Sequence, residues 1–177
     1  MTSPSMLEPK LLALREAFDQ SFVAAVGGER PPQLDFLAVR IAGDPYALRL
    51  SEIQSLHASR RVVAAPSQLP ELLGMAGFRG VLTPVYDLAR LLGYGAEASA
   101  KWLVVVQQAS PIAFAFGGFE AHLRVTLERV SAPELGTSAA VRGAVQHAAS
   151  ALPLLHLPSL VEGISQRIKT FGSVQER

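Results

Sequence analysis

The sequence predicts a mainly β protein in which two small β-barrel subdomains follow one amphipathic helix. Short strands of alternating polarity begin at Leu34, and a hairpin of the first half recurs in the second half. The chain has 177 residues, 49% hydrophobic and 18% charged, which suits one domain or two small subdomains with a shared core. We expect a helix and linker over 1–33, barrels over roughly 34–98 and 99–168, and a tail over 169–177.

The first predicted element is a helix over residues 5–26. Its apolar residues recur at steps of three and four and form one stripe, and Ser5 with Glu8 forms a capping-box pattern. The sequence GGERPP at 27–32 ends the helix. The stripe packs against its own domain or docks a partner, and the sequence leaves both open.

Two hairpins follow, over residues 34–50 and 101–116. Each has an alternating strand, a turn with a proline, and a second alternating strand. Shifting the first hairpin by 66 positions aligns the turn prolines and several apolar residues. The aligned pairs are Phe36 on Trp102, Leu37 on Leu103, Val39 on Val105, Pro45 on Pro111, Tyr46 on Ile112, Leu48 on Phe114, Leu50 on Phe116 and Ile53 on Phe119.

The end of each half also repeats. RGVLTPVYDLARLLG, from Arg79, is matched by RGAVQHAASALPLLHLPSLVEG, from Arg142. We align Arg142-Gly143 with Arg79-Gly80, and align Pro153, Leu157 and Leu160 with Pro84, Leu88 and Leu91 at a shift of 69. Each half should then end in a short strand and a helical turn. A recurring Arg-Gly pair favours a structural role for Arg79, against which any binding role must be weighed.

The composition disfavours most catalytic and nucleic-acid-binding classes. The four histidines lack metal-ligand spacing, the chain has no Cys, and no phosphate-binding loop or G-x-S-x-G occurs. We therefore expect no cofactor, no metal and no enzyme. A net charge of +1 without an aromatic and basic stripe disfavours nucleic acid.

The distribution of apolar residues predicts a protein-binding module. No apolar run reaches the roughly 18 residues of a membrane-spanning helix, and the charged N-terminus is unlike a signal peptide, so we expect a cytoplasmic protein. Two small barrels have much surface for their volume, and the mean hydropathy is +0.27. Exposed apolar patches on such a surface usually mark protein-protein contacts.

The motifs in YALRLSEIQSL and LGMAGFRGVLTPVYDLARLLG resemble the CheW domain in order and spacing, over roughly residues 34–163. The matching positions of the second motif are Gly74, Phe78, Arg79, Gly80, Pro84, Asp87 and Leu88. The resemblance implies two five-stranded SH3-like barrels and a non-enzymatic adaptor of bacterial chemosensory arrays. Such an adaptor couples methyl-accepting chemoreceptor tip helices to the regulatory domain of a CheA-type histidine kinase. The resemblance also implies contacts with other CheW-like domains and a place at membrane-associated arrays without membrane insertion.

The resemblance also implies partner-binding positions. Arg79, with Phe78 and Gly80 beside it, matches the motif arginine of the receptor and kinase interface. Ile53 matches the apolar position of a helix-like turn that also contains Gln54 and, in place of the usual acidic residue, Ser55.

Three further positions depart from the family pattern. Gly77 replaces the motif Asn, so we expect glycine's conformational freedom to hold that turn. Gly117 and His156 stand where aspartates are usual. The N-terminal helix and the divergent second half are similar to family members of pilus- or gliding-linked systems.

These features suggest a mechanism and two alternatives. A groove between the barrels, lined by Val, Leu and Phe, would take the apolar face of a receptor helix, with Arg79 making forked hydrogen bonds at its rim. The first alternative is a CheW-fold protein that binds one partner only, as an array spacer or inhibitor. The second is a small β-barrel ligand-binding protein or enzyme, which would need convergent titratable residues in a cavity.

Overall fold

The computed structural model describes residues 32–97, 100–132 and 139–174. The predicted helix over 5–26 lies outside these residues. No helix in the described part of the chain is long and apolar enough to cross a membrane.

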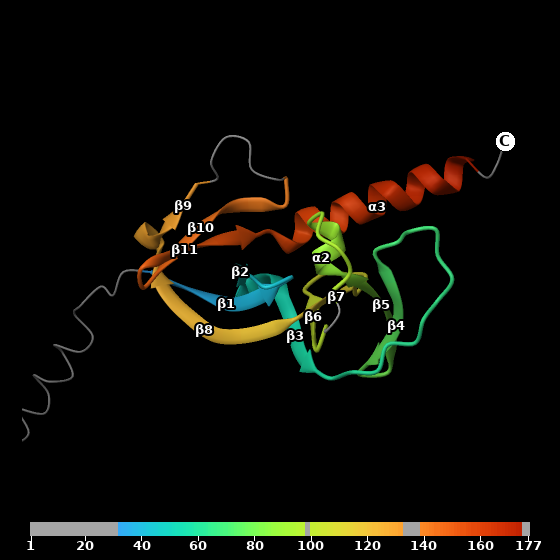
Figure 1. Ribbon diagram of the computed structural model, residues 1–177, viewed down its shortest axis with the longest axis horizontal. Coiled ribbons are helices and arrows are strands. Elements are labelled where there is room, and N and C mark those ends of the chain that lie inside the picture. The colour runs from blue at the N-terminus through green and yellow to red at the C-terminus, as the bar shows by residue number, and fades with distance from the viewer. Residues whose placement is uncertain (1–31, 98–99, 133–138, 175–177) are drawn as a thin grey trace, which may run out of the picture. The chain divides into compact units, whose positions relative to one another are not determined.

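The described residues form two sheets, which lie on the left and the right of Figure 1. The six-stranded sheet has the order β8-β1-β2-β11-β10-β9, and the five-stranded sheet has the order β3-β6-β7-β5-β4. The strands are β1 (Gln33–Ile41), β2 (Asp44–Arg49), β3 (Ile53–Ala58), β4 (Leu72–Phe78), β5 (Val81–Asp87), β6 (Trp102–Val106), β7 (Ala113–Phe116), β8 (Gly118–Thr126), β9 (Val130–Ser131), β10 (Val141–His147) and β11 (Ser150–Leu155). The helices are η2 (Leu50–Glu52), α2 (Leu88–Leu91), η3 (Leu127–Arg129) and α3 (Leu157–Val174).

The two halves of the chain exchange their first hairpins. The hairpin β1-β2 completes the sheet of the second half, where β2 pairs in parallel with β11. The hairpin β6-β7 completes the sheet of the first half, where β7 pairs in parallel with β5. The boundary expected near residue 98 therefore does not separate two barrels, because each sheet needs strands from both halves. A repeat shows that two hairpins are alike, but it does not show which sheet each one joins.

The internal repeat is confirmed, with a corrected register in the first strand. Leu37 pairs with Leu48, and Val104 pairs with Phe114, so Leu37 corresponds to Val104 at a shift of 67. The second strands keep the shift of 66, because the paired residues Val104 and Phe114 are one position closer along the chain than Leu37 and Leu48. A slip of one residue moves side chains to the opposite face of a strand. The residues that our alignment matched in the two first strands therefore lie on opposite faces of their strands.

Three apolar clusters hold the two sheets. One cluster belongs to the six-stranded sheet and includes Phe36, and another belongs to the five-stranded sheet and includes Phe78. The largest contains buried residues of both sheets and of α3, among them Val39, Phe114 and Ile164. Apolar side chains of both halves therefore fill a shared core in the region where we expected an open groove.

The helix that ends each half is capped by equivalent residues. Asp87 Oδ1 accepts a hydrogen bond from the Ala89 N–H at 3.0 Å at the start of α2. His156 Nδ1 accepts one from the Ser159 N–H at 3.2 Å at the start of α3, so His156 replaces an aspartate and keeps its capping role. α2 is the expected single turn, whereas α3 continues to Val174, through most of the segment expected to be a tail.

Candidate functional site

The turn between β4 and β5 places Arg79 in an unfavourable backbone conformation. Arg79 has φ +48° and Gly80 has φ +81° in a two-residue hairpin loop. Two positive φ values define the type I′ turn, which favours Asn-Gly. A left-handed conformation costs a residue with a Cβ about 1–2 kcal/mol. An arginine at this position is therefore not explained by the turn itself.

The equivalent turn of the second half contains no arginine. β4 and β10 have a bulge at the same place, and Gly74 and Gly143 have φ +143° and +145°. This shift of 69 aligns Arg142-Gly143 with Leu73-Gly74, so our alignment with Arg79-Gly80 was wrong. The same shift makes Ala148, with φ +50°, the residue equivalent to Arg79. The second half therefore closes the equivalent two-residue loop without an arginine, although only Ala148 of that loop has a positive φ. The repeat no longer supports a structural role for Arg79.

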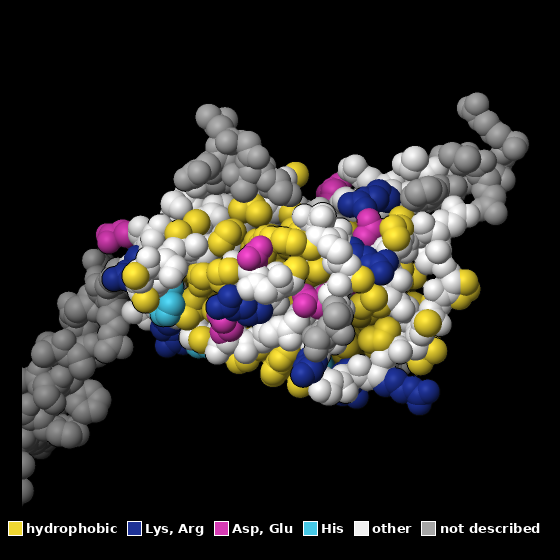
Figure 2. Space-filling model, viewed as in Figure 1, with side chains coloured by type: hydrophobic (Ala, Val, Ile, Leu, Met, Phe, Trp, Pro, Cys, Tyr) yellow, Lys and Arg dark blue, Asp and Glu magenta, His cyan; other side chains and the backbone are white. Residues whose placement is uncertain are grey.

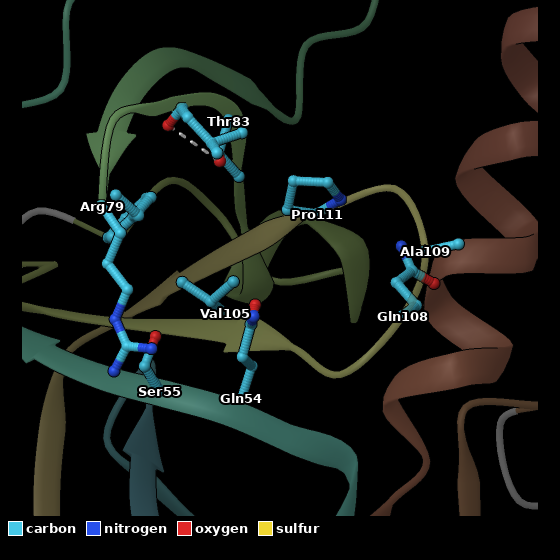
Figure 3. Close-up of a pocket in the computed structure, with 10 residues that line it drawn as sticks. Gln54, Ser55, Arg79, Thr83, Val105, Gln108, Ala109 and Pro111 are labelled. Atoms are coloured by element: carbon cyan, nitrogen blue, oxygen red, sulfur yellow. Dashed lines mark hydrogen bonds between the residues drawn. The ribbon is translucent and has the colours of Figure 1, made fainter.

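Arg79 lies at a pocket of about 330 Å³. Figure 3 shows its side chain running from the β4-β5 turn toward Ser55 and Gln54 on β3, with Val105 of β6 also facing the pocket. The remaining lining residues are Phe78, Val81, Thr83, Gln108, Ala109 and Pro111. All ten residues belong to β3–β7 and their turns, so the pocket is in the five-stranded sheet and not between the sheets.

The β3 wall of the pocket is set by a bulge and an aromatic contact. Ile53 and Ser55 pair with Val106 and Val105, so Gln54 is the extra residue of a β-bulge. The His57 ring contacts Phe78 of β4 with a centroid distance of 4.8 Å. β3 and β4 are the two edges of the sheet, so this contact brings the edges together. The helix-like turn of the motif is present as η2, which Ile53 caps, whereas Gln54 and Ser55 lie in β3.

The charge at the pocket is positive. Arg79 is its only charged lining residue among the residues that the structure describes. Burial lowers the pKa of the neighbouring His57, and the charges of Arg60 and Arg79 lower it further. Such a rim favours a carboxylate or a carbonyl oxygen of a bound group.

One pair near the pocket has the composition of a catalytic dyad. His57 Nε2 and Ser55 Oγ are 2.9 Å apart. In serine hydrolases a carboxylate stabilises the imidazolium that forms when histidine accepts the serine proton. The charged groups that act on His57 here are arginines, which destabilise the imidazolium. The arrangement is therefore poorly suited to general-base catalysis.

The structure brings four of the six predicted partner-binding residues to the pocket, namely Arg79, Phe78, Ser55 and Gln54. Gly80 completes the turn beside them, and Ile53 packs against the shared core. Their role in binding stays a prediction. The expectation for Gly77 was wrong, because Gly77 lies in β4 without a left-handed φ, and a Cβ there would meet open space.

The lining residues that come from β5 and from the β6-β7 turn were not among the predicted site residues. Val81 and Thr83 follow the Arg-Gly pair on the wall-forming face of β5, which strand alternation could have indicated. Gln108, Ala109 and Pro111 reach the pocket only through the pairing of β6 with β3 and of β7 with β5. That pairing is not local in sequence, and no sequence signal marks it.

Exposed aliphatic side chains continue from the pocket rim. Val81 is 50% exposed and Leu82 is 67% exposed, directly after the Arg-Gly turn. Adjacent residues of a strand point to opposite faces, so Val81 faces the pocket and Leu82 the outside of the sheet. The turn thus carries a cation and two apolar groups, a combination typical of protein-protein contacts.

Comparisons with known proteins agree with this architecture. The family model of the CheW-like domain matches residues 35–165. The solved structure of the scaffolding protein TtCheW from Thermoanaerobacter tengcongensis matches with a TM-score of 0.65 at 16% identity, covering 72% of this chain and 90% of that chain. A search of curated proteins gave no match. Because the family model spans most of the chain, the protein belongs to the CheW-like domain family of chemotaxis scaffold proteins.

Proposed function

We propose that this chain is a non-enzymatic adaptor that couples chemoreceptor tip helices to the regulatory domain of a CheA-type histidine kinase. The observation that carries this proposal is Arg79, a cation held at a pocket rim in a turn that the fold makes elsewhere with alanine. Membership of the CheW-like family supports the class of partner. The adaptor would act in the cytoplasm, at membrane-associated receptor arrays, and could also contact other CheW-like domains.

The mechanism is a change of contacts between two partners without a covalent step. An apolar face of one partner packs on the exposed Val81, while Arg79 donates forked hydrogen bonds to a carboxylate or carbonyl oxygen beside it. The other partner binds a different part of the domain. A receptor signal reaches the kinase when it favours one arrangement of these contacts over another.

The test is co-sedimentation of the Arg79→Glu variant with receptor tips and kinase. Arginines in the centre of an interface often contribute about 2 kcal/mol or more, so we expect roughly thirtyfold weaker binding of at least one partner. Arg129→Glu, an exposed arginine in η3 of the other sheet, is the matched control. If folded Arg79→Glu protein still co-sediments like the wild type, the pocket is not the interface.

Separate pull-downs distinguish the coupler from a protein with one partner. Ser55 stands where the family motif has an acid and lines the same pocket, so one of the two contacts could be missing here. Binding of receptor tips and of the kinase regulatory domain, each alone, supports the coupler. Binding of only one of them indicates a spacer or an inhibitor.

A further inference from the structure

Four cations meet at one end of the five-stranded sheet, and the proposed function uses only one of them. Arg60 and Arg61 follow β3, Lys101 precedes β6, and Arg79 lies in the β4-β5 turn. The Ser59 N–H donates to the Lys101 carbonyl at 2.7 Å, so the arginine pair and Lys101 are neighbours. The contact between His57 and Phe78 brings Arg79 to the same end. We call Arg60, Arg61, Arg79 and Lys101 the basic end.

The carboxylates of the five-stranded sheet are all committed elsewhere. Residues 53–117 contain three acidic residues, and these make internal contacts away from the basic end. Glu71 pairs with Arg167 of α3, Asp87 caps α2, and Glu97 Oε2 accepts from the Ala42 N–H. The cations of the basic end make no ion pair with any residue that the structure describes.

This separation of charge is unusual for the chain as a whole. Its net charge is +1, so the cations are not part of a general positive surplus. Elsewhere several exposed arginines pair with carboxylates, as in Arg40 with Glu120 at 2.5 Å and Arg124 with Asp35 at 2.9 Å. Figure 2 shows Lys and Arg side chains along the lower right edge, below β3 and β4, next to apolar side chains and away from the acidic ones.

We infer that the basic end binds an acidic, amphipathic segment of a protein partner, whose apolar residues pack on the Arg79 pocket and whose carboxylates face Arg60, Arg61 and Lys101. The inference rests on the proposed function and specifies the chemistry of the partner at that site. Charge complementarity argues for carboxylates, and the exposed Val81, which faces the pocket, argues for apolar residues in the same segment.

A nucleic acid fits this surface less well. Binding of single strands uses aromatic side chains on which bases stack. The large hydrophobic side chains exposed in the described residues are all aliphatic, namely Leu50, Val63, Val81, Leu82, Leu127 and Ile168. A protein segment makes use of both the charge and the aliphatic groups.

The test compares two double variants of the full chain. Arg60→Ala/Arg61→Ala removes two charges of the basic end and leaves Arg79 in place. Arg129→Ala/Lys169→Ala removes two exposed charges elsewhere and is the matched control. The probes are a purified chemoreceptor tip hairpin and a CheA-type regulatory domain, each also prepared with its surface Asp and Glu changed to Asn and Gln. Titrations run at several salt concentrations, and thermal melting confirms that the variants are folded.

We expect the Arg60→Ala/Arg61→Ala variant to bind one probe about three- to tenfold more weakly, with a flatter salt dependence, while the control binds normally. The neutralised form of that probe should bind wild type and variant equally.

If Arg79→Glu loses binding but Arg60→Ala/Arg61→Ala keeps wild-type affinity and salt dependence, this inference is wrong and the proposed function stands. If neither Arg79→Glu nor Arg60→Ala/Arg61→Ala weakens binding of either probe, both this inference and the proposed function are wrong. If the arginine pair instead governs binding to duplex DNA or to phosphatidylserine vesicles, the partner is not an acidic protein segment.

Discussion

Replacing Arg79 by asparagine should make the protein more stable and less able to bind its partner. Arg79 has φ +48°, and a left-handed conformation costs an ordinary residue about 1–2 kcal/mol, part of which asparagine avoids. Asn-Gly is also the preferred pair for a type I′ turn. The Arg79 side chain makes no hydrogen bond or ion pair with a described residue that the change would break. The substitution also removes a positive charge near Arg60, because both arginines act on His57.

The expected gain is about 0.5–1 kcal/mol in the free energy of unfolding, or about 2–3 °C in Tm for a domain of this size. Urea unfolding followed by circular dichroism measures the gain, and titration with receptor tip and kinase regulatory domain measures the loss of affinity, at least about tenfold. The matched control is Ala148→Asn in the equivalent turn, where φ is +50°. That loop has only one positive φ and no glycine, so Asn there should relieve the left-handed strain alone and give a smaller gain in stability, with no change in affinity.

The claim that Arg79 strains the turn without stabilising it is wrong if Arg79→Asn lowers the free energy of unfolding by 1 kcal/mol or more while Ala148→Asn raises it. That result would mean that the Arg79 side chain holds the turn or the pocket. The proposed binding role of Arg79 is wrong if the Arg79→Asn variant is more stable and binds both partners at wild-type affinity. The strained arginine would then have no role at this surface.

Three other predictions follow from the same geometry. Gly74→Ala should cost about 3 kcal/mol or prevent folding, because its Cβ would lie 2.1 Å from a backbone oxygen at φ +143°, and a normal urea midpoint would contradict this. Residues 33–98 expressed alone should give no dispersed NMR spectrum, since neither sheet is complete in that half. Burial, and then the neighbouring arginines, hold the pKa of His57 below 6.5, so its protonation destabilises the fold as the pH falls below that value. In Arg79→Asn an NMR titration should show that pKa rising, and an unchanged value would place Arg79 away from His57.

The sequence predicted local structure well, because alternation and turn residues act over a few positions. Both hairpins and the helical turn after Asp87 are present. The exchange of hairpins between the halves could not be predicted, since β2 pairs with β11 more than a hundred residues later and such pairing leaves no local pattern. The motif found Arg79, Phe78, Ser55 and Gln54, whereas the β6-β7 turn reaches the pocket only through that non-local pairing.

One error came from identity of residues and not from missing information. Arg142-Gly143 repeats the letters of Arg79-Gly80, and we accepted insertions to align them. The shift of 69 that relates Pro84 to Pro153 needs no insertion, and it places Ala148 opposite Arg79. A constant spacing was therefore a better guide to structural equivalence than a shared dipeptide, because strand pairing fixes spacing but not side chains.

The internal repeat acts as a control that separates the requirements of the fold from those of binding. Features that both halves keep belong to the fold, such as the bulge glycines, Pro84 with Pro153, and the caps at Asp87 and His156. Features of one half alone need another cause. At the shift of 69 these differences are concentrated in one turn. Phe78, Arg79, Gly80, Val81 and Leu82 are equivalent to His147, Ala148, Ala149, Ser150 and Ala151. The second half makes this hairpin with small and polar residues, so burial and turn geometry do not demand the cation and the exposed aliphatic groups of the first. Selection for a partner at this turn is the remaining physical reason for keeping them. Exchanging only Arg79, Val81 and Leu82 with Ala148, Ser150 and Ala151 would move the binding surface and leave the buried Phe78 and the turn glycine in place.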